Sequence, residues 1–272
     1  MNRPQPNQGF TLLELVLVMV LIGILAALTV DILLKPFRAF QDQARRAELV
    51  AEADTAMTRM VRELRHALPN SVRVGGGGKY LEFIPTIDGG RYRAAQDPTM
   101  PGTEDTLDFT QPDSSFEVVG GLQSGETQAG DYVVVYNTTA SGLGTNAYQG
   151  DNRALIHIQS VDANSITLAI PQQFPHPSLD AQRFDVVPST GPVTFYCHAG
   201  QLRRHTGYGF QSGQPTGFTN QGALLAGHVT LCQFDYDPGD HVRHGIVTMR
   251  LELSDEGETI ALLYQAQVVN AP

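Results

Sequence analysis

Apolar residues dominate the start of the chain and then give way to a mixed pattern. From Phe10 to Leu34 nearly every residue is apolar. As a helix rising about 1.5 Å per residue, this run would measure about 38 Å, and a hydrocarbon core is about 30 Å thick. The pattern therefore predicts a transmembrane helix over residues 10–34.

Beyond that run, the apolar positions of residues 35–68 recur every three or four residues, which is the spacing of an amphipathic helix. Charged residues occupy the other faces. Pro36 predicts a bend at the start of this segment, and Pro69 predicts its end. The apolar positions are Phe37, Phe40, Ala44, Ala47, Val50, Ala53, Met57, Met60 or Val61, Leu64 and Leu68.

Short alternations of apolar and polar residues fill the rest of the chain, and this period of two predicts antiparallel strands. We expect a β-rich variable region at residues 79–190, with loops at 85–105 and 137–153, and a C-terminal antiparallel sheet at 191–272. Gly75–Gly78 is expected to be a flexible break. The expected strands are 80–84, 106–109, 116–119, 132–136, 154–161, 165–170, 193–197, 201–204, 228–236, 245–253 and 258–269.

One of these strands indicates which face of the sheet is covered. Its apolar residues Val247, Met249, Leu251 and Leu253 alternate with polar ones. Such alternation is typical of a sheet with one face buried, and the amphipathic helix is the natural cover. The predicted fold class is α+β, with a long N-terminal helix packed on an antiparallel β-sheet head.

Composition narrows the possible functions. The net charge is -10 and the pI is near 5.2, which argues against a nucleic-acid surface. The sequence contains no Gly-x-Ser-x-Gly elbow, no phosphate-binding loop and no His-Glu-x-x-His motif. We therefore expect neither an enzyme nor a bound cofactor.

Two groups of residues contain side chains of the types that bind metals. The first lies on a turn rich in Pro and Gly, where a solvated loop is the favoured interpretation; it comprises Asp237, Asp240, His241 and His244. The second lacks the regular spacing of an EF-hand; it comprises Asp97, Glu104, Asp105 and Asp108. No metal site is expected.

The carboxylate of Glu14 is unusual inside an apolar run. An ionised acid in a spanning helix costs about 2.5 to 3.5 kcal/mol, so it generally has a partner. Cleavage after Gly9 would create an α-amine on Phe10, one helical turn away. The two charges could pair within one chain or between neighbouring chains.

The sequence Gly9-Phe10-Thr11-Leu12-Leu13-Glu14 resembles the processing and N-methylation motif of type IV prepilins and type II secretion pseudopilins. The resemblance implies that residues 1–9 are a leader, that a prepilin peptidase cleaves after Gly9 and methylates Phe10, and that Glu14 neutralises a neighbour's N-terminus. The implied partners are the peptidase, other minor and major pilins, and the inner membrane. The head would lie in the periplasm and later in a filament at the cell surface.

Further segments, namely residues 62–74, 191–197 with 200–202, and 231–236, resemble the MshO family of minor pilins of mannose-sensitive haemagglutinin (MSHA) pili. This resemblance implies a type IV pilin-like fold and a subunit that primes assembly or lies at the tip. Two alternatives stay open. One is a J-type pseudopilin of type II secretion, and the other is an adhesin or lectin-like head that binds a ligand through residues 85–190.

The two cysteines, Cys197 and Cys232, both lie on expected strands with apolar neighbours on the same face, so both side chains should point inward. A head carried out of the cytoplasm enters an oxidising compartment, which favours a disulfide between them.

Overall fold

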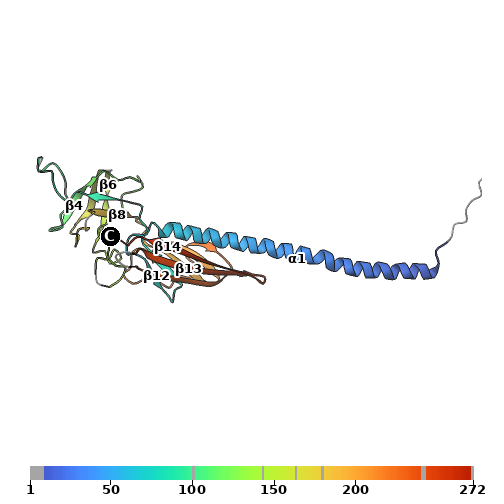
Figure 1. The fold of residues 1–272 in the computed structure, drawn as a ribbon. Helices are drawn as coiled ribbons and strands as arrows, with labels where there is room; N and C mark the ends of the chain where they lie inside the picture. Colours follow the sequence, from blue (N-terminus) through green and yellow to red (C-terminus); the bar gives the residue numbers. More distant parts are fainter. Residues whose placement is uncertain are drawn as a thin grey trace, which may run out of the picture. The chain divides into compact units, whose positions relative to one another are not determined.

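The computed structural model describes residues 9–99, 102–142, 144–162, 164–178, 181–239 and 243–270. The chain forms two compact units, Met1–Glu48 and Leu49–Pro272. In the described residues the elements are a long helix and the strands of a β-rich head, and Figure 1 labels several of them.

Helix α1 spans Leu12–Leu64 and includes Pro36. Its end comes earlier than the predicted residue 68 because the next residues pair with another segment. The amide of Leu68 donates to the carbonyl of Ile84 at 2.7 Å, and the carbonyl of His66 accepts from the amide of Thr86 at 2.7 Å. These bonds draw the chain away from the helix axis.

A five-stranded antiparallel sheet has the order β1-β2-β9-β10-β11. Its strands are β1 (Arg73–Gly75), β2 (Tyr80–Phe83), β9 (Val193–His198), β10 (Gln201–Thr206) and β11 (Ala223–Ala226). A second sheet has three strands, β12 (Val229–Asp237), β13 (Gly245–Asp255) and β14 (Glu258–Val268). The expected single sheet over 191–272 is therefore wrong, because the strands of that segment belong to two sheets.

The residues between β2 and β9 form a closed barrel with the order β3-β4-β7-β6-β5-β8. Its strands are β3 (Asp88–Tyr92), β4 (Asp113–Val119), β5 (Tyr132–Val134), β6 (Arg153–Asp162), β7 (Ser165–Gln172) and β8 (Arg183–Val187). The barrel has its own apolar core, which includes Phe116, Ile156 and Phe184. The β-rich variable region expected at residues 79–190 thus contains a closed β-barrel.

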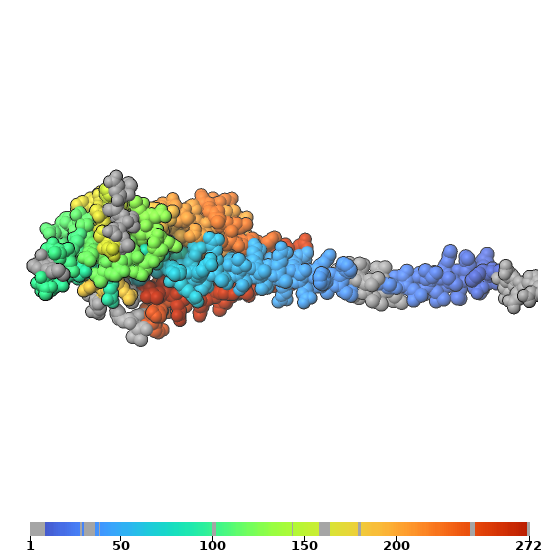
Figure 2. All heavy atoms as spheres, turned by 90° about the horizontal axis from the view of Figure 1, so that it is seen from above, coloured from blue at the N-terminus to red at the C-terminus, as the bar shows by residue number. Residues whose placement is uncertain are grey.

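One core joins the C-terminal part of α1 to both sheets. Figure 2 shows this part of the helix, in cyan, between the orange and the red strands. Burial on the helix begins at Leu49, whereas the predicted Phe37, Phe40 and Val50 are exposed. The buried helix residues are Leu49, Ala53, Ala56, Met57, Met60 and Leu64.

The alternation predicted for β13 is confirmed. Val247, Met249, Leu251 and Leu253 are all buried in the core that α1 shares. The turn to β14 consists of Glu256 and Gly257, which have φ angles of 43° and 94°. Two residues with positive φ are what a tight hairpin turn requires.

The expectation of a flexible break at Gly75–Gly78 is wrong. Gly75 ends β1 and pairs with Tyr80, and the intervening residues form a tight turn. Gly78 has a φ of 84°, and its carbonyl accepts a 2.8 Å hydrogen bond from the amide of Phe234. The glycines are therefore needed for a packed turn.

The expected strand at 106–109 is also wrong. Leu107 is buried, and its amide donates to the carbonyl of Arg93 at 2.9 Å. Asp108 then accepts bonds from the amide and hydroxyl of Thr110, which turns the chain before a ladder can form. Sequence reasoning missed four strands, namely β1, β3, β8 and β11.

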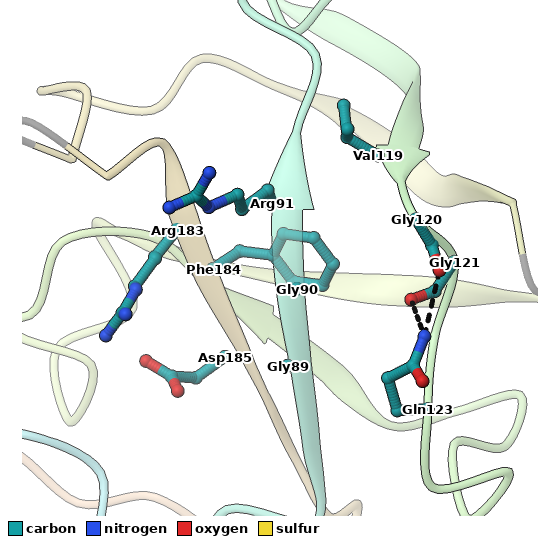
Figure 3. Close-up of a pocket in the computed structure, with 10 residues that line it drawn as sticks. All are labelled: Gly89, Gly90, Arg91, Val119, Gly120, Gly121, Gln123, Arg183, Phe184 and Asp185. Carbon is teal, nitrogen blue, oxygen red and sulfur yellow. Dashed lines mark hydrogen bonds between the residues drawn. The ribbon is translucent and has the colours of Figure 1, made fainter.

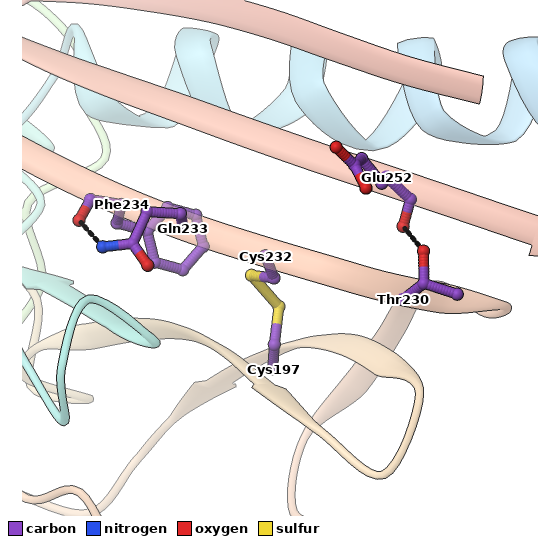
Figure 4. The surroundings of a disulfide bond; sticks show 6 residues. All are labelled: Cys197, Thr230, Cys232, Gln233, Phe234 and Glu252. Carbon is purple, nitrogen blue, oxygen red and sulfur yellow. Dashed lines mark hydrogen bonds between the residues drawn. A yellow bond between two sulfur atoms is a disulfide. The ribbon is translucent and has the colours of Figure 1, made fainter. Parts of the chain in front are cut away.

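A disulfide between Cys197 on β9 and Cys232 on β12 connects the two sheets (Figure 4). Cys232 is buried and Cys197 is half-buried. Two backbone bonds accompany it, from Val229 to Gly200 at 2.9 Å and from Phe234 to Gly78 at 2.8 Å. The two sheets are thus held together covalently as well as by their shared core.

Candidate assembly site at the start of the helix

The expected cleavage position lies just before α1. Gly9 and Phe10 are exposed, and Phe10 shows 77% of its surface. A Cβ added at Gly9 would meet no other heavy atom within 4 Å. The peptide bond after Gly9 is therefore unobstructed by the described residues of its own chain.

Thr11 caps the helix. The amide of Glu14 donates to the Thr11 hydroxyl at 3.3 Å and to the Thr11 carbonyl at 3.1 Å. Thr-x-x-Glu is the sequence of a capping box, in which Glu or Gln at the third helical position is favourable. Sequence reasoning missed this role of Thr11, although the spacing was a readable signal.

Glu14 lies in the first turn of α1, where a negative charge interacts favourably with the helix dipole. Its side chain is exposed, and its carboxylate forms no hydrogen bond or ion pair with another described residue. The acid is therefore available to a group outside this chain.

The first turns of α1 expose apolar side chains in every direction. A helix that is apolar all round is normally buried against protein or lipid, because each exposed aliphatic side chain is costly in water. The exposed large residues are Leu12, Leu13, Leu15, Val16, Leu17, Val18, Met19, Val20, Leu21, Ile22, Ile24 and Leu25.

In the described part of the chain, no helix meets the length and hydropathy required of a membrane span. The transmembrane helix expected over residues 10–34 thus stays a prediction.

The acids considered for a metal have other contacts. Asp97 accepts bonds from the amide and hydroxyl of Thr99, and Glu104 pairs with Arg93 at 2.9 Å. Asp105 accepts from Ser115 at 2.6 Å. Among the described residues, no group of three His, Cys, Asp or Glu side chains could hold a metal.

The first group of metal candidates lies only partly within the described residues. Asp240 and His241 lie outside the described residues. The carboxylate of Asp237 accepts the amide of Gly239 at 3.0 Å, as in an ordinary turn.

Residues 5–30 match a family model described as the prokaryotic N-terminal methylation motif. No curated protein and no solved structure matches the chain. The chain thus carries a prepilin N-terminal methylation motif of the type IV pilin kind, at the start of α1.

The motif implies a pilin or pseudopilin subunit, a structural protein that is processed by prepilin peptidase and assembles with other pilins. It also suggests attachment to a membrane. The exposed apolar turns, and a Glu14 carboxylate that has no partner among the described residues, agree with a subunit that is completed by its neighbours.

Proposed function

We propose that this protein is a minor pilin of a type IV pilus of the MSHA kind, which primes assembly or lies at the filament tip. The observation that carries the proposal is the methylation motif at the start of α1. The MSHA assignment rests on the resemblance of residues 62–74, 191–197 with 200–202, and 231–236 to MshO minor pilins.

In this proposal, prepilin peptidase cleaves after Gly9 and methylates the new amine of Phe10. The methylated amine stays protonated at neutral pH and needs a counter-charge in an apolar filament core. Glu14 of a neighbouring subunit supplies it, and the pairing fixes the axial register of the two helices.

The proposed location follows from the apolar segment that the motif begins. Residues 10–34 anchor the protein in the inner membrane as a single pass, with the head in the periplasm, until the subunit enters a filament. An oxidising compartment favours the disulfide between Cys197 and Cys232.

Replacing Glu14 by Gln tests the assembly role. Gln keeps the bond from the backbone amide of residue 14 to the Thr11 hydroxyl and is also favourable at this position of a helix, whereas the charge is lost. An unpaired buried charge costs about 3 kcal/mol or more, so pili per cell should fall at least about tenfold, by electron microscopy. Mass spectrometry should still find the N-terminus cleaved and methylated.

Glu48→Gln is the matched control, because Glu48 is an exposed glutamate of the same helix. This variant should assemble normally. Normal piliation in Glu14→Gln would remove the proposed role of the carboxylate, and piliation lost equally in both variants would show that the effect is not specific to Glu14.

A J-type pseudopilin of type II secretion shares the motif and is the alternative within this class. Deleting the gene separates the two functions. Loss of pili with normal protein secretion is the expected result, and loss of secretion with normal pili would assign the subunit to the secretion system.

A further inference from the structure

A cavity of about 370 Å³ lies on the barrel where β3 and β8 meet the loop after β4 (Figure 3). Glycines line part of it, at positions 89, 90, 120 and 121. Because glycine has no side chain, the backbone there is accessible to a bound molecule. Four polar side chains surround this space, namely Arg91, Gln123, Arg183 and Asp185.

The two arginines lie at opposite positions on neighbouring strands. Arg91 on β3 and Arg183 on β8 are directly paired in the antiparallel register. Side chains at such positions lie close together, and like charges there destabilise the sheet. Both are exposed, and neither guanidinium has a hydrogen bond or short ion pair with another described residue. The pair is therefore a ready binding point for an anion.

Asp185 lies two residues from Arg183, and Gly89 is its partner across the strands. Its Oδ1 lies 3.5 Å from the position of a Cβ added at Gly89, so the carboxylate lies beside the bare backbone. In Figure 3, the side chains of Arg91, Arg183 and Asp185 extend to one side of β3, and the ring of Phe184 overlaps this strand in the view.

The Asp185 carboxylate accepts no hydrogen bond from another described residue. Burial raises its pKa to about 6, although the charge of Arg183 opposes the shift. A partly buried carboxylate without a donor is costly, and a ligand hydroxyl would satisfy it.

Gln123 offers a second acceptor. Its Nε2 donates to the carbonyls of Gly120 at 2.8 Å and Gly121 at 3.1 Å, which fixes the side chain (Figure 3). The Oε1 atom is then left to accept from a ligand. Two arginines and one aspartate together give the cavity one net positive charge, which suits a monoanion that carries hydroxyl donors.

We propose that this cavity binds an acidic sugar, with the sugar carboxylate held between Arg91 and Arg183 and its hydroxyls donating to Asp185 and Gln123. Paired guanidinium groups suit the planar carboxylate geometrically. A phosphate monoester would bring a second negative charge. This inference does not depend on the type of filament to which the subunit belongs.

Titration of the full chain in detergent with D-glucuronic acid at pH 7.5, followed by calorimetry, tests the proposal. D-Glucose and inorganic phosphate are the comparison ligands. Glucuronate should bind at least about tenfold more tightly than either, because only it has both a carboxylate and several hydroxyls. Raising the salt concentration should weaken its binding.

Arg91→Gln and Arg183→Gln should each weaken glucuronate binding at least about tenfold, and Asp185→Asn should weaken it as well. Arg250→Gln is the matched control, since Arg250 is an exposed arginine of β13. Its binding should equal that of the wild type. Melting curves of each variant identify any that fail to fold, and Arg91→Lys then serves as a milder second test.

Several outcomes would overturn the proposal. Equal binding of glucose and glucuronate would show that the arginines do not bind the sugar carboxylate. Tighter binding of phosphate would make the cavity an inorganic anion site, and no saturable binding of glucuronate would remove the site altogether.

Discussion

At the scale of single residues, Glu14 has a local role and a proposed external one. Its amide takes part in the cap formed by Thr11, while its carboxylate is exposed and has no partner among the described residues. A capping box contributes about 1 kcal/mol to a helix terminus. Because this cap uses the backbone amide of residue 14, both Gln and Ala would keep it, and Gln also keeps the length of the side chain while it removes the charge.

The pKa of Asp185 leads to a prediction about stability and pH. Because burial raises this pKa from 3.8 to about 6, ionisation favours the unfolded state. The contribution of the protonated group is present below about pH 4 and is lost as the pH rises through about 6. Relative to Asp185→Asn, the wild type should lose about 3 kcal/mol between pH 3 and pH 7.

Urea unfolding of both proteins across this range gives the measurement. The Asn variant should be similar in stability at low pH and the more stable protein at neutral pH. A constant difference between the two would show that Asp185 titrates normally in the folded state.

At the scale of elements, the turn between β1 and β2 shows how glycines act in a packed site. Gly77 and Gly78 both have positive φ, of 67° and 84°. A Cβ at Gly77 meets nothing within 4 Å, whereas one at Gly78 comes within 1.9 Å of the Gln233 side chain and 3.0 Å of the Phe234 carbonyl.

Gly77→Ala should therefore cost about 1 kcal/mol, which is the backbone penalty alone. Gly78→Ala should cost roughly 2 to 4 kcal/mol, because it also disturbs the contact with β12. Urea unfolding of the two variants in parallel measures the difference. An equal loss of unfolding free energy in the two variants would mean that the turn can move to accept the added methyl group without disturbing Phe234.

The strands that sequence reasoning missed fall into two kinds. β8 alternates polar Arg183 and Asp185 with buried Phe184 and Val186, so a period-two signal was present. β3 begins with Asp88-Gly89-Gly90, and aspartate and glycine are both uncommon in strands. The strand forms because it pairs with β4 and β8. Pairing with strands that are distant in sequence cannot be predicted from the pattern of the local residues.

The two candidate sites differ in the same way, because one could be predicted from neighbouring residues and the other could not. The methylation motif and the long helix were readable because they depend on neighbouring residues. The cavity was not, because Arg91 and Arg183 are far apart in sequence and meet only through the register of β3 and β8.

At the scale of the whole molecule, the barrel is a single insertion in the sequence of the five-stranded sheet. β2 and β9 are neighbours in the five-stranded sheet, and the whole barrel lies between them in sequence. Its first and last strands also pair, with Asp88 opposite Val186. The chain therefore enters and leaves the barrel at adjacent points.

Deleting residues 88–187 and joining the ends by two glycines should leave both sheets and the disulfide intact. Stability should fall, because Leu68 and Ile84 lose their contacts with Val134 and Tyr148. Non-reducing peptide mapping and urea unfolding measure both effects, and the proposed processing after Gly9 should be unchanged. Loss of the disulfide or of cooperative unfolding would show that the barrel is needed for folding.

The adjacent entry and exit points have an evolutionary consequence. An insertion between two strands that already pair leaves the hydrogen-bond register of the parent sheet unchanged, so the inserted part can diverge or be exchanged under separate selection. The same junction is a rational place to graft a foreign domain for display, with the barrel as the natural precedent.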